Sequence, residues 1–131
     1  MSLYIKRKVD FQHIDERGSL SQLIHDGFKQ INVLESKKGV ERGSHFHKES
    51  IEAFYVISGS VKVTLWNKNE KEEVVFKKGD FFEIHPFVLH HMLFLSDCLM
   101  VQMYDIPVEK LDGKKDIFSQ DDYALNSKRG Y

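Results

Sequence analysis

The stretch that decides the fold is Gly39–Gly59, which reads GVERGSHFHKESIEAFYVISG. His45 and His47 stand two residues apart, so both imidazoles project from one face if this segment is a β-strand. Glu52 follows after a gap of four residues, which gives the chain room to turn and enter a second strand. Two imidazoles and a carboxylate that converge in this way form a ligand set suited to iron, zinc, manganese or nickel.

The rest of the chain has a hydrophobic period of two, which is typical of β-strands. Phe54 and Val56 share the face of Glu52, and we expect that face to form the interior of the fold. Polar turns separate the apolar runs. The strand candidates are Gly18–Ile24, Lys29–Leu34, Glu52–Ile57, Val61–Trp66, Glu73–Phe76, Phe81–Ile84, His90–Phe94 and Leu99–Tyr104.

Short strands at this spacing predict an all-β fold, an antiparallel sandwich or barrel, rather than a parallel α/β sheet. We expect one domain over residues 1–131, with a small closed barrel whose core covers about 18–105. The remaining residues, 106–131, are predicted to form a short and mostly irregular C-terminal arm, in which Ser119–Asp122 at most begins a short helix.

Composition narrows the possible functions. The 131 residues include 7 His but a single Cys, Cys98, which excludes an intrachain disulfide framework and a Cys-rich zinc module. A net charge of −1 offers no general electrostatic footprint for nucleic acid. No apolar run approaches the roughly 18 residues of a membrane span, and the first residues lack the apolar core of a secretory signal. We therefore expect a cytoplasmic protein that binds neither nucleic acid nor membrane.

The segment from Gly39 satisfies the pattern G-x5-H-x-H-x4-E-x6-G, which resembles the first motif of the cupin superfamily. The second cupin motif is matched in part by Gly79–Phe94, where His85, Phe87 and Phe94 replace its Pro, Gly and Asn. The resemblance implies an antiparallel jelly-roll barrel that binds a divalent metal ion, with His45, His47, Glu52 and His90 as candidate ligands. Counting from Pro86 instead would favour His91 as the fourth ligand.

Three further segments resemble sugar-nucleotide cupins, including dTDP-sugar 3,4-ketoisomerases and 3,5-epimerases. They are Asp15–Leu20 (DERGSL), Arg42–Lys48 (RGSHFHK) and His90–Cys98 (HHMLFLSDC). The resemblance implies an isomerase or epimerase of a nucleotide-linked 4-keto sugar, in polysaccharide or deoxysugar biosynthesis. In this chemistry a base removes a proton next to the ketone, an enediolate forms, and the proton returns at another position.

The resemblance also implies roles for individual side chains. If no metal is bound, His45 and His47 are the acid and base candidates, since the pKa of histidine lies near neutrality. Arg17 and Arg42 could hold the diphosphate of the substrate.

The ketoisomerases commonly have Gln where this chain has Glu52, so the carboxylate ligand is a departure from their pattern. If a metal occupies the site, His45 and His47 lose their lone pairs to it, and another acid or base is needed. His85, Tyr104 and Glu83 are the candidates for that role.

Two other functions remain open at this stage. The two-His, one-carboxylate set is also that of non-haem iron dioxygenases, and a barrel mouth can bind a sugar without turning it over. We also expect a homodimer, because an antiparallel sandwich exposes edge strands that need covering. Tyr4–Val9 alternates apolar and basic residues and is suited to pair with an edge of the second copy.

Overall fold

The computed structural model describes residues 2–123, and nearly all its regular structure is β-strand. The strands are β1 (Ile5–Lys6), β2 (Phe11–Asp15), β3 (Gly18–Gln22), β4 (Gln30–Ser36), β5 (Glu41–Phe46), β6 (Glu52–Ser58), β7 (Ser60–Trp66), β8 (Lys71–Lys77), β9 (Phe81–Ile84), β10 (Leu89–Phe94), β11 (Cys98–Tyr104) and β12 (Phe118–Ser119). They form two five-stranded sheets, ordered β1-β9-β6-β11-β4 (the β6 sheet) and β12-β5-β10-β7-β8 (the β5 sheet). Every strand pair is antiparallel. This confirms the predicted all-β jelly roll.

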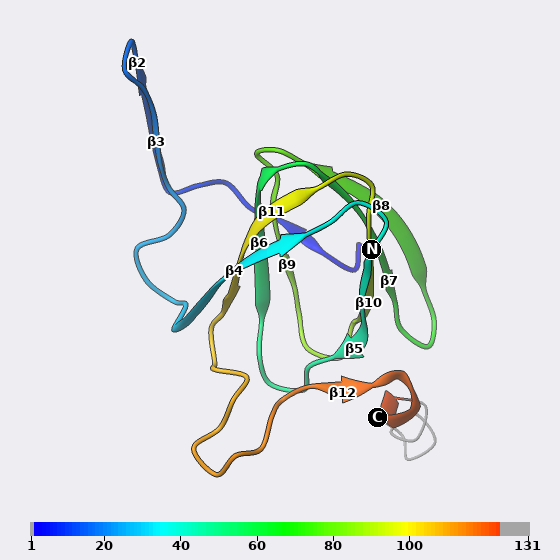
Figure 1. Ribbon diagram of the computed structural model, residues 1–131. Helices are drawn as coiled ribbons and strands as arrows, with labels where there is room; N and C mark the ends of the chain where they lie inside the picture. The colour runs from blue at the N-terminus through cyan, green and yellow to red at the C-terminus, as the bar shows by residue number, and fades with distance from the viewer. Residues whose placement is uncertain (1, 124–131) are drawn as a thin grey trace.

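The main core lies between the inner faces of the two sheets (Figure 1). On β7 the residues Val61, Val63 and Leu65 are fully buried, and the polar residues between them are only half-buried. Phe54 and Val56 on β6 belong to the same cluster, as their shared face with Glu52 predicts. Burying side chains of this size stabilises the fold by roughly 1.5–3 kcal/mol each before the entropic cost of ordering them.

The opposite face of the β6 sheet carries a second, smaller cluster. Ala53, Phe81 and Met103 are buried there because the segment 23–28 passes over them with Leu23, Ile24 and Phe28. This cluster covers the outer face of the β6 sheet. The inner face contributes to the main core and, near one end of the barrel, carries polar side chains.

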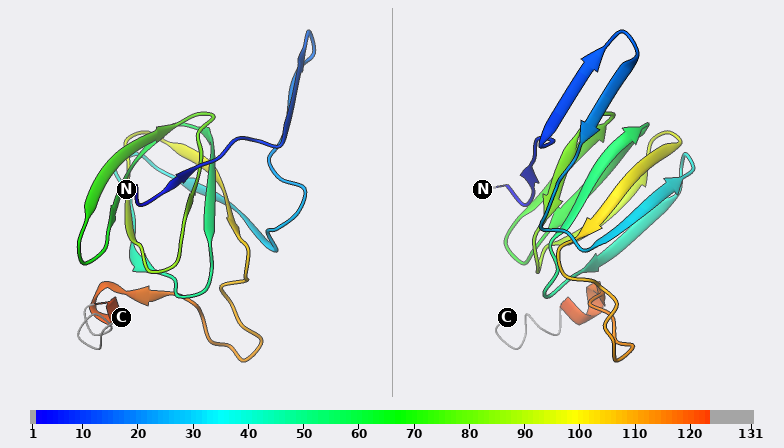
Figure 2. Two further views of the ribbon diagram at one scale, coloured as in Figure 1. Left: turned by 180° about the vertical axis from the view of Figure 1, so that it is seen from behind. Right: turned by 90° about the vertical axis from the view of Figure 1, so that its left-hand side faces the viewer.

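The predicted strand at 18–24 forms, but the structure places it outside the barrel. It pairs with β2, which the periodicity did not indicate, in a two-stranded hairpin that projects away from both sheets (Figures 1 and 2). Phe11 and Leu20 on this hairpin are exposed, so no other part of residues 2–123 covers these apolar side chains. The first strand to enter a sheet after the hairpin is β4.

The N-terminal strand is also shorter than predicted. Only Ile5–Lys6 is extended in a sheet, and it pairs with Phe82 and Glu83 of β9 in the same chain. Since β1 is the edge strand of its sheet and pairs on one side only among residues 2–123, the expectation that Tyr4–Val9 pairs with a second copy stays a prediction.

The C-terminal arm crosses one end of the barrel (Figure 2). Its strand β12 pairs with β5, with Phe118 opposite Phe46 and Ser119 opposite His45. One helical turn follows at 120–123, as the sequence allowed, and the rest of the predicted arm, 124–131, lies outside the described residues. Between residues 2 and 123 no helix is long and apolar enough to cross a membrane.

Gly59, between β6 and β7, provides a test of the fold. Its φ is +86°, and a Cβ added there would overlap the Asp97 carbonyl oxygen and lie 2.8 Å from the Cys98 Cα. We expect Gly59→Ala to lower the free energy of unfolding by about 3 kcal/mol, because left-handed strain and overpacking add. Gly79→Ala is the matched control, since Gly79 has φ +89° but open space around it, and should lose only about 1 kcal/mol. Urea denaturation measures both, and equal losses would contradict the close-packing argument.

Candidate functional site

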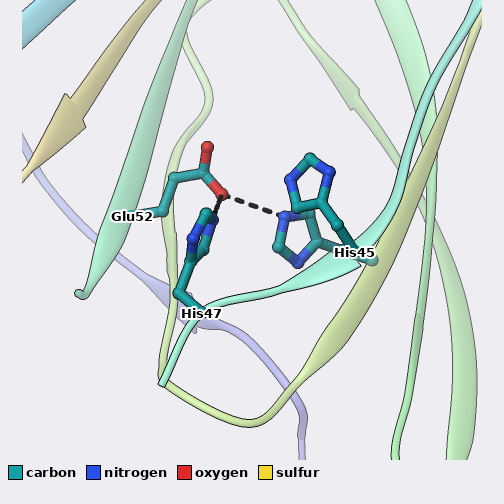
Figure 3. A group of neighbouring side chains, drawn as sticks. His45, His47 and Glu52 are labelled. Carbon is teal, nitrogen blue, oxygen red and sulfur yellow. Dashed lines mark hydrogen bonds and ion pairs between the residues drawn. The ribbon is translucent and has the colours of Figure 1, made fainter. Parts of the chain in front are cut away.

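Three imidazoles and one carboxylate meet between the two sheets, as Figure 3 shows for the three residues that it labels. His45 lies on β5 and His90 on the neighbouring β10, whereas Glu52 begins β6 in the opposite sheet. His47 follows directly after β5. One potential ligand atom from each of the four residues lies within 4.8 Å of the others. The structure thus brings together the four residues that the sequence singled out.

A β-bulge aims these side chains. The pairing of β10 with β5 shifts its register between His90 and His91. Opposite this point, Gly43 and Ser44 have φ values of +104° and +63°, and a Cβ on Gly43 would lie 2.7 Å from the His90 carbonyl oxygen. As a result His90 joins the cluster, and His91 lies 3.3 Å from the Glu41 carboxylate instead. Of the two candidates for the fourth position, His90 is the one at the cluster.

The backbone fixes the orientation of two of the rings. Nδ1 of His47 donates to the carbonyl oxygen of Asp116 at 2.6 Å, and Nδ1 of His90 donates to that of Val88 at 3.0 Å. Because a carbonyl oxygen can only accept, each Nδ1 carries a proton. Both rings therefore present Nε2 to Oε1 of Glu52, at 3.2 Å for His47 and 3.0 Å for His90.

This arrangement requires a positive charge at the cluster. A lone pair on each Nε2 would face a carboxylate oxygen, which is repulsive unless a proton or a cation lies between them. For His47 a second proton meets the need: burial opposes it, but the contact with Glu52 outweighs burial and raises the pKa of His47. His90 Nε2 lacks hydrogen-bond alignment with Glu52, and it is the one buried side-chain nitrogen or oxygen without a partner in the part of the chain described.

The other oxygen of Glu52 is held by neutral donors. Oε2 accepts from the Tyr104 hydroxyl at 2.7 Å and from the Gln102 amide at 2.8 Å, and Gln102 in turn accepts from Asn32 at 3.0 Å. Burial opposes ionisation of Glu52, yet its contacts with His47 and His90 hold the pKa of the carboxyl well below its usual range. Burial and the nearby carboxylate raise the pKa of Tyr104, so its hydroxyl stays protonated and remains a donor.

His45 differs from the other two histidines. Burial and the neighbouring His90 lower the pKa of His45 to about 4, so the ring is uncharged near neutral pH. It lies on the wall of a cavity of about 520 Å³, together with Glu52 and His90. The other polar residues that line this cavity are Gln30, Asn32, Glu41, Arg42, Gln102, Tyr104 and Glu109. An uncharged imidazole in a polar cavity can accept a proton or bind a metal ion.

Two of the predicted substrate and catalytic residues line this cavity. Tyr104 does so next to Glu52, and Arg42 does so with its guanidinium held by Ser36 Oγ at 2.9 Å and by the Glu35 carbonyl at 3.1 Å. Two residues of β4 therefore orient Arg42 before any ligand arrives.

The other two predicted residues lie elsewhere. Arg17 is on the projecting hairpin, where it pairs with Asp15 at 2.6 Å. His85, a candidate acid or base, does not line the cavity, because Ile84 points into the core and strand alternation turns Glu83 and His85 to the outer face. There His85 bonds Glu83 at 2.8 Å and remains 43% exposed, and Glu83 also pairs with Arg7.

Sequence reasoning missed three residues that support the cluster. Gln102 stands two residues before Tyr104 on a predicted strand and shares its face, so alternation could have identified it. Asn32 lies directly opposite Gln102 in the pairing of β4 with β11, which only the register reveals. Asp116 has no signal at all, because it is far from the cluster in sequence and follows no motif.

The family comparison covers most of the barrel. Residues 13–105 match the family model described as the polysaccharide biosynthesis C-terminal domain. No curated protein matches the sequence.

Many solved structures have the same fold. A mutant of the 3,4-ketoisomerase QdtA from Thermoanaerobacterium thermosaccharolyticum, in complex with TDP-4-keto-6-deoxyglucose, is 18% identical, with a TM-score of 0.81 over 100% of this chain and 98% of that one. The TDP-quinovose 3,4-ketoisomerase WlaRB from Campylobacter jejuni is 16% identical, with a TM-score of 0.80 over 96% and 99% of the two chains. The rmlC epimerase of Mycobacterium tuberculosis is 18% identical, with a TM-score of 0.65 over 79% and 64%.

At these identities the likeness shows the fold, which is the cupin jelly roll that the sequence motifs predicted. The family match extends over more than half of the chain and includes His45, His47, Glu52 and His90. The protein therefore belongs to the polysaccharide biosynthesis C-terminal domain family.

Proposed function

We propose that this protein is a metal-binding cupin that isomerises or epimerises a nucleotide-linked 4-keto sugar. The observation that carries the proposal is the group of three imidazoles and a carboxylate, three of whose members line a polar cavity. The fold likeness to enzymes that act on TDP-linked keto sugars supports the same assignment.

The reaction needs a base beside the ketone of the substrate. Protons on the carbons next to a ketone are acidic, so an uncharged imidazole can remove one, and a proton can return elsewhere on the enediolate. His45 is uncharged and lines the cavity, which makes it the preferred base when no ion is bound. His47 belongs to the cluster but is buried and does not line the cavity. A proton on its ring balances the charge of Glu52.

The donor set also fits a divalent ion, with zinc, iron, nickel and manganese as the candidates. The fit rests on the partnerless Nε2 of His90 and on the Nδ1 bonds that turn Nε2 of His47 and His90 toward Glu52. His45, His47, Glu52 and His90 would hold the ion. When bound, it would supply a Lewis acid that polarises the ketone of the substrate. Tyr104, whose hydroxyl bonds Glu52, then remains as a proton donor on the cavity wall.

The same ligand set favours a second candidate function, that of a non-haem iron dioxygenase. A third candidate, binding of a sugar without turnover, is compatible with the cavity and its amide side chains. Oxygen consumption after anaerobic iron loading is the signature of the second candidate. The third is recognised by ligand binding without proton exchange.

We further propose that the chain forms a homodimer through the projecting hairpin. Phe11 and Leu20 are exposed on one face of the hairpin, and Ile31 and Val33 are exposed on β4, which pairs on one side only among the described residues. Docking the hairpin of one copy against β4 of the other would cover both apolar sets and the unpaired edge. It would also bring Arg17 toward the cavity of the second copy, because β4 contributes Gln30 and Asn32 to the wall.

The first prediction concerns proton exchange. Incubated in deuterium oxide with a panel of dTDP- and UDP-linked 4-keto sugars, the protein should exchange a proton next to the ketone of at least one, as mass spectrometry would detect. His45→Asn should slow this exchange roughly a hundredfold or more, because it removes the base. His25→Asn is the control, since His25 pairs with Asp10 on the surface. The absence of exchange with every sugar of the panel would refute the proposed reaction.

The second prediction separates the two forms of the mechanism. Protein purified without chelator should contain a divalent metal by elemental analysis, and Glu52→Gln should weaken metal binding about tenfold or more because the amide carries no charge. Glu49→Gln is the control, because Glu49 lies three residues before Glu52, in the connection that leads to β6, but pairs with Lys110. Loss of proton exchange together with the metal would support the metal-assisted form. Exchange that survives in a metal-free Glu52→Gln protein would support the free-histidine form.

The third prediction addresses the dimer. Small-angle scattering at micromolar concentration should give the mass of two chains. Leu20→Asp should shift the equilibrium toward monomer by at least tenfold in Kd, because a carboxylate would be buried at the interface. Val75→Asp replaces an equally exposed apolar residue on β8, the edge strand of the other sheet, and should leave the mass unchanged. A monomeric wild-type mass would contradict the proposal.

A further inference from the structure

The C-terminal arm brings one buried acid up to the cluster. Asp116 is 4% exposed and lies in the segment that crosses the end of the barrel, outside the matched residues 13–105. Its side chain does not face the cavity, so it cannot contact a substrate there. Its contacts are instead with the connection between β5 and β6.

The carboxylate of Asp116 holds that connection by three backbone amides. Oδ1 accepts from the amide of Lys48 at 2.8 Å, and Oδ2 accepts from those of Glu49 and Ser50 at 3.0 and 2.9 Å. The Ser50 hydroxyl also lies 3.0 Å from Oδ2. These bonds outweigh burial and hold the pKa of Asp116 below its usual range, so it remains an acceptor. Without the carboxylate, three amide donors would lose their partner, and the loss is costly for the buried amide of Ser50.

The connection held in this way carries two members of the cluster at its ends. His47 precedes residues 48–50, and Glu52 follows two residues after them. The backbone carbonyl of the same Asp116 accepts the Nδ1 proton of His47 at 2.6 Å, and its own amide donates to the Val108 carbonyl at 2.9 Å. One residue of the arm thus contacts both the loop between the two ligand candidates and the ring of one of them.

We propose that Asp116 is a positioning residue of the site: its carboxylate holds the connection 48–50, and its backbone carbonyl holds the Nδ1–H of His47, so that Nε2 points at Glu52. The proposal deepens the proposed function, since it names the part of the chain outside the matched domain that makes the cluster competent. It predicts that the arm is needed for the chemistry and not only for covering Phe46.

A purely structural role gives a different expectation. If Asp116 only anchors the arm, its loss should lower the free energy of unfolding but leave the His47 ring as it is in the molecules that remain folded. The state of the two ring nitrogens of His47 therefore distinguishes a positioning role from a purely structural one. It can be observed without metal or substrate.

The experiment compares Asp116→Ala with Asp112→Ala. Asp112 is an exposed acid of the same arm that bonds the Lys114 amide at 3.0 Å, so its variant matches the change in charge without touching the cluster. Proton–nitrogen NMR of histidine-labelled protein reports which ring nitrogens are protonated, and a His47→Gln spectrum assigns the signals of His47. In wild type and Asp112→Ala, Nδ1 of His47 should be protonated. In Asp116→Ala, the Nδ1–H signal of His47 should shift or broaden, because the arm that carries its acceptor is no longer anchored to residues 48–50.

Titration with zinc alone gives the second readout. Removing the support of a ligand histidine typically weakens metal binding 10- to 100-fold, so Asp116→Ala should do so and Asp112→Ala should not. A folded Asp116→Ala protein whose His47 signals match wild type would overturn the proposal, whatever its zinc affinity.

If Asp116→Ala does not fold, Asp116→Asn answers the question. An asparagine keeps the volume, but only one of its two polar atoms can accept, so it satisfies the amides of residues 48–50 only in part. The His47 signals should then be perturbed to a smaller degree, and unchanged signals would again overturn the proposal. Because these spectra need no turnover, the proposed reaction can fail in the exchange assay while the role of Asp116 is still decided.

Discussion

The structure depends on a carboxylate buried between two β-sheets. Glu52 is 1% exposed, and an ionised carboxylate that deep is tolerated only if both of its oxygens are satisfied. The imidazoles of His47 and His90 face one oxygen, and the neutral donors Tyr104 and Gln102 hold the other. The partners come from both sheets, so the charge ties the two layers together at the end of the barrel where the cavity lies. If any one of these partners were removed, a buried polar group would either lose its hydrogen bond or face a group of like charge.

Satisfying that carboxylate requires backbone conformations that ordinary residues rarely adopt. Ser44 and Phe87 have φ values of +63° and +65°, and each such residue costs on the order of 1–2 kcal/mol. Ser44 directly precedes His45, and Phe87 lies in the turn before His90 and donates its amide to the His47 carbonyl at 2.8 Å. Ser44 thus lies within a strand that carries a cluster residue, and Phe87 lies just before another. Strain gathered at one site, and opposed by the surrounding sheets, is what a functional constraint on the backbone produces.

The sequence predicted the structure where alternating apolar and polar residues mark which face of a strand is buried. Alternation along 52–57 and 61–66 predicted the buried sides of β6 and β7, and the spacing of His45, His47 and Glu52 predicted that they converge. It failed where the deciding contact is distant. The hairpin strand 18–22 has strand-like residues, yet nothing in them says that the partner is β2 rather than the barrel. Asp116 reaches the cluster only because the arm folds back, and no periodicity records that.

The residues that line the cavity leave it short of positive charge. Glu41, Glu52 and Glu109 line the cavity, against the single guanidinium of Arg42, which Ser36 of β4 already holds. A nucleotide diphosphate would meet net repulsion there unless positive charge is added. Glu52 raises the pKa of His47, so a proton on that ring offsets the charge of Glu52, and His91 lies 3.3 Å from Glu41. The remaining sources are a divalent ion at the cluster and Arg17 of a second copy. Each would turn an acidic cavity into one that accepts an anionic ligand, so metal binding and dimerisation address the same electrostatic deficit.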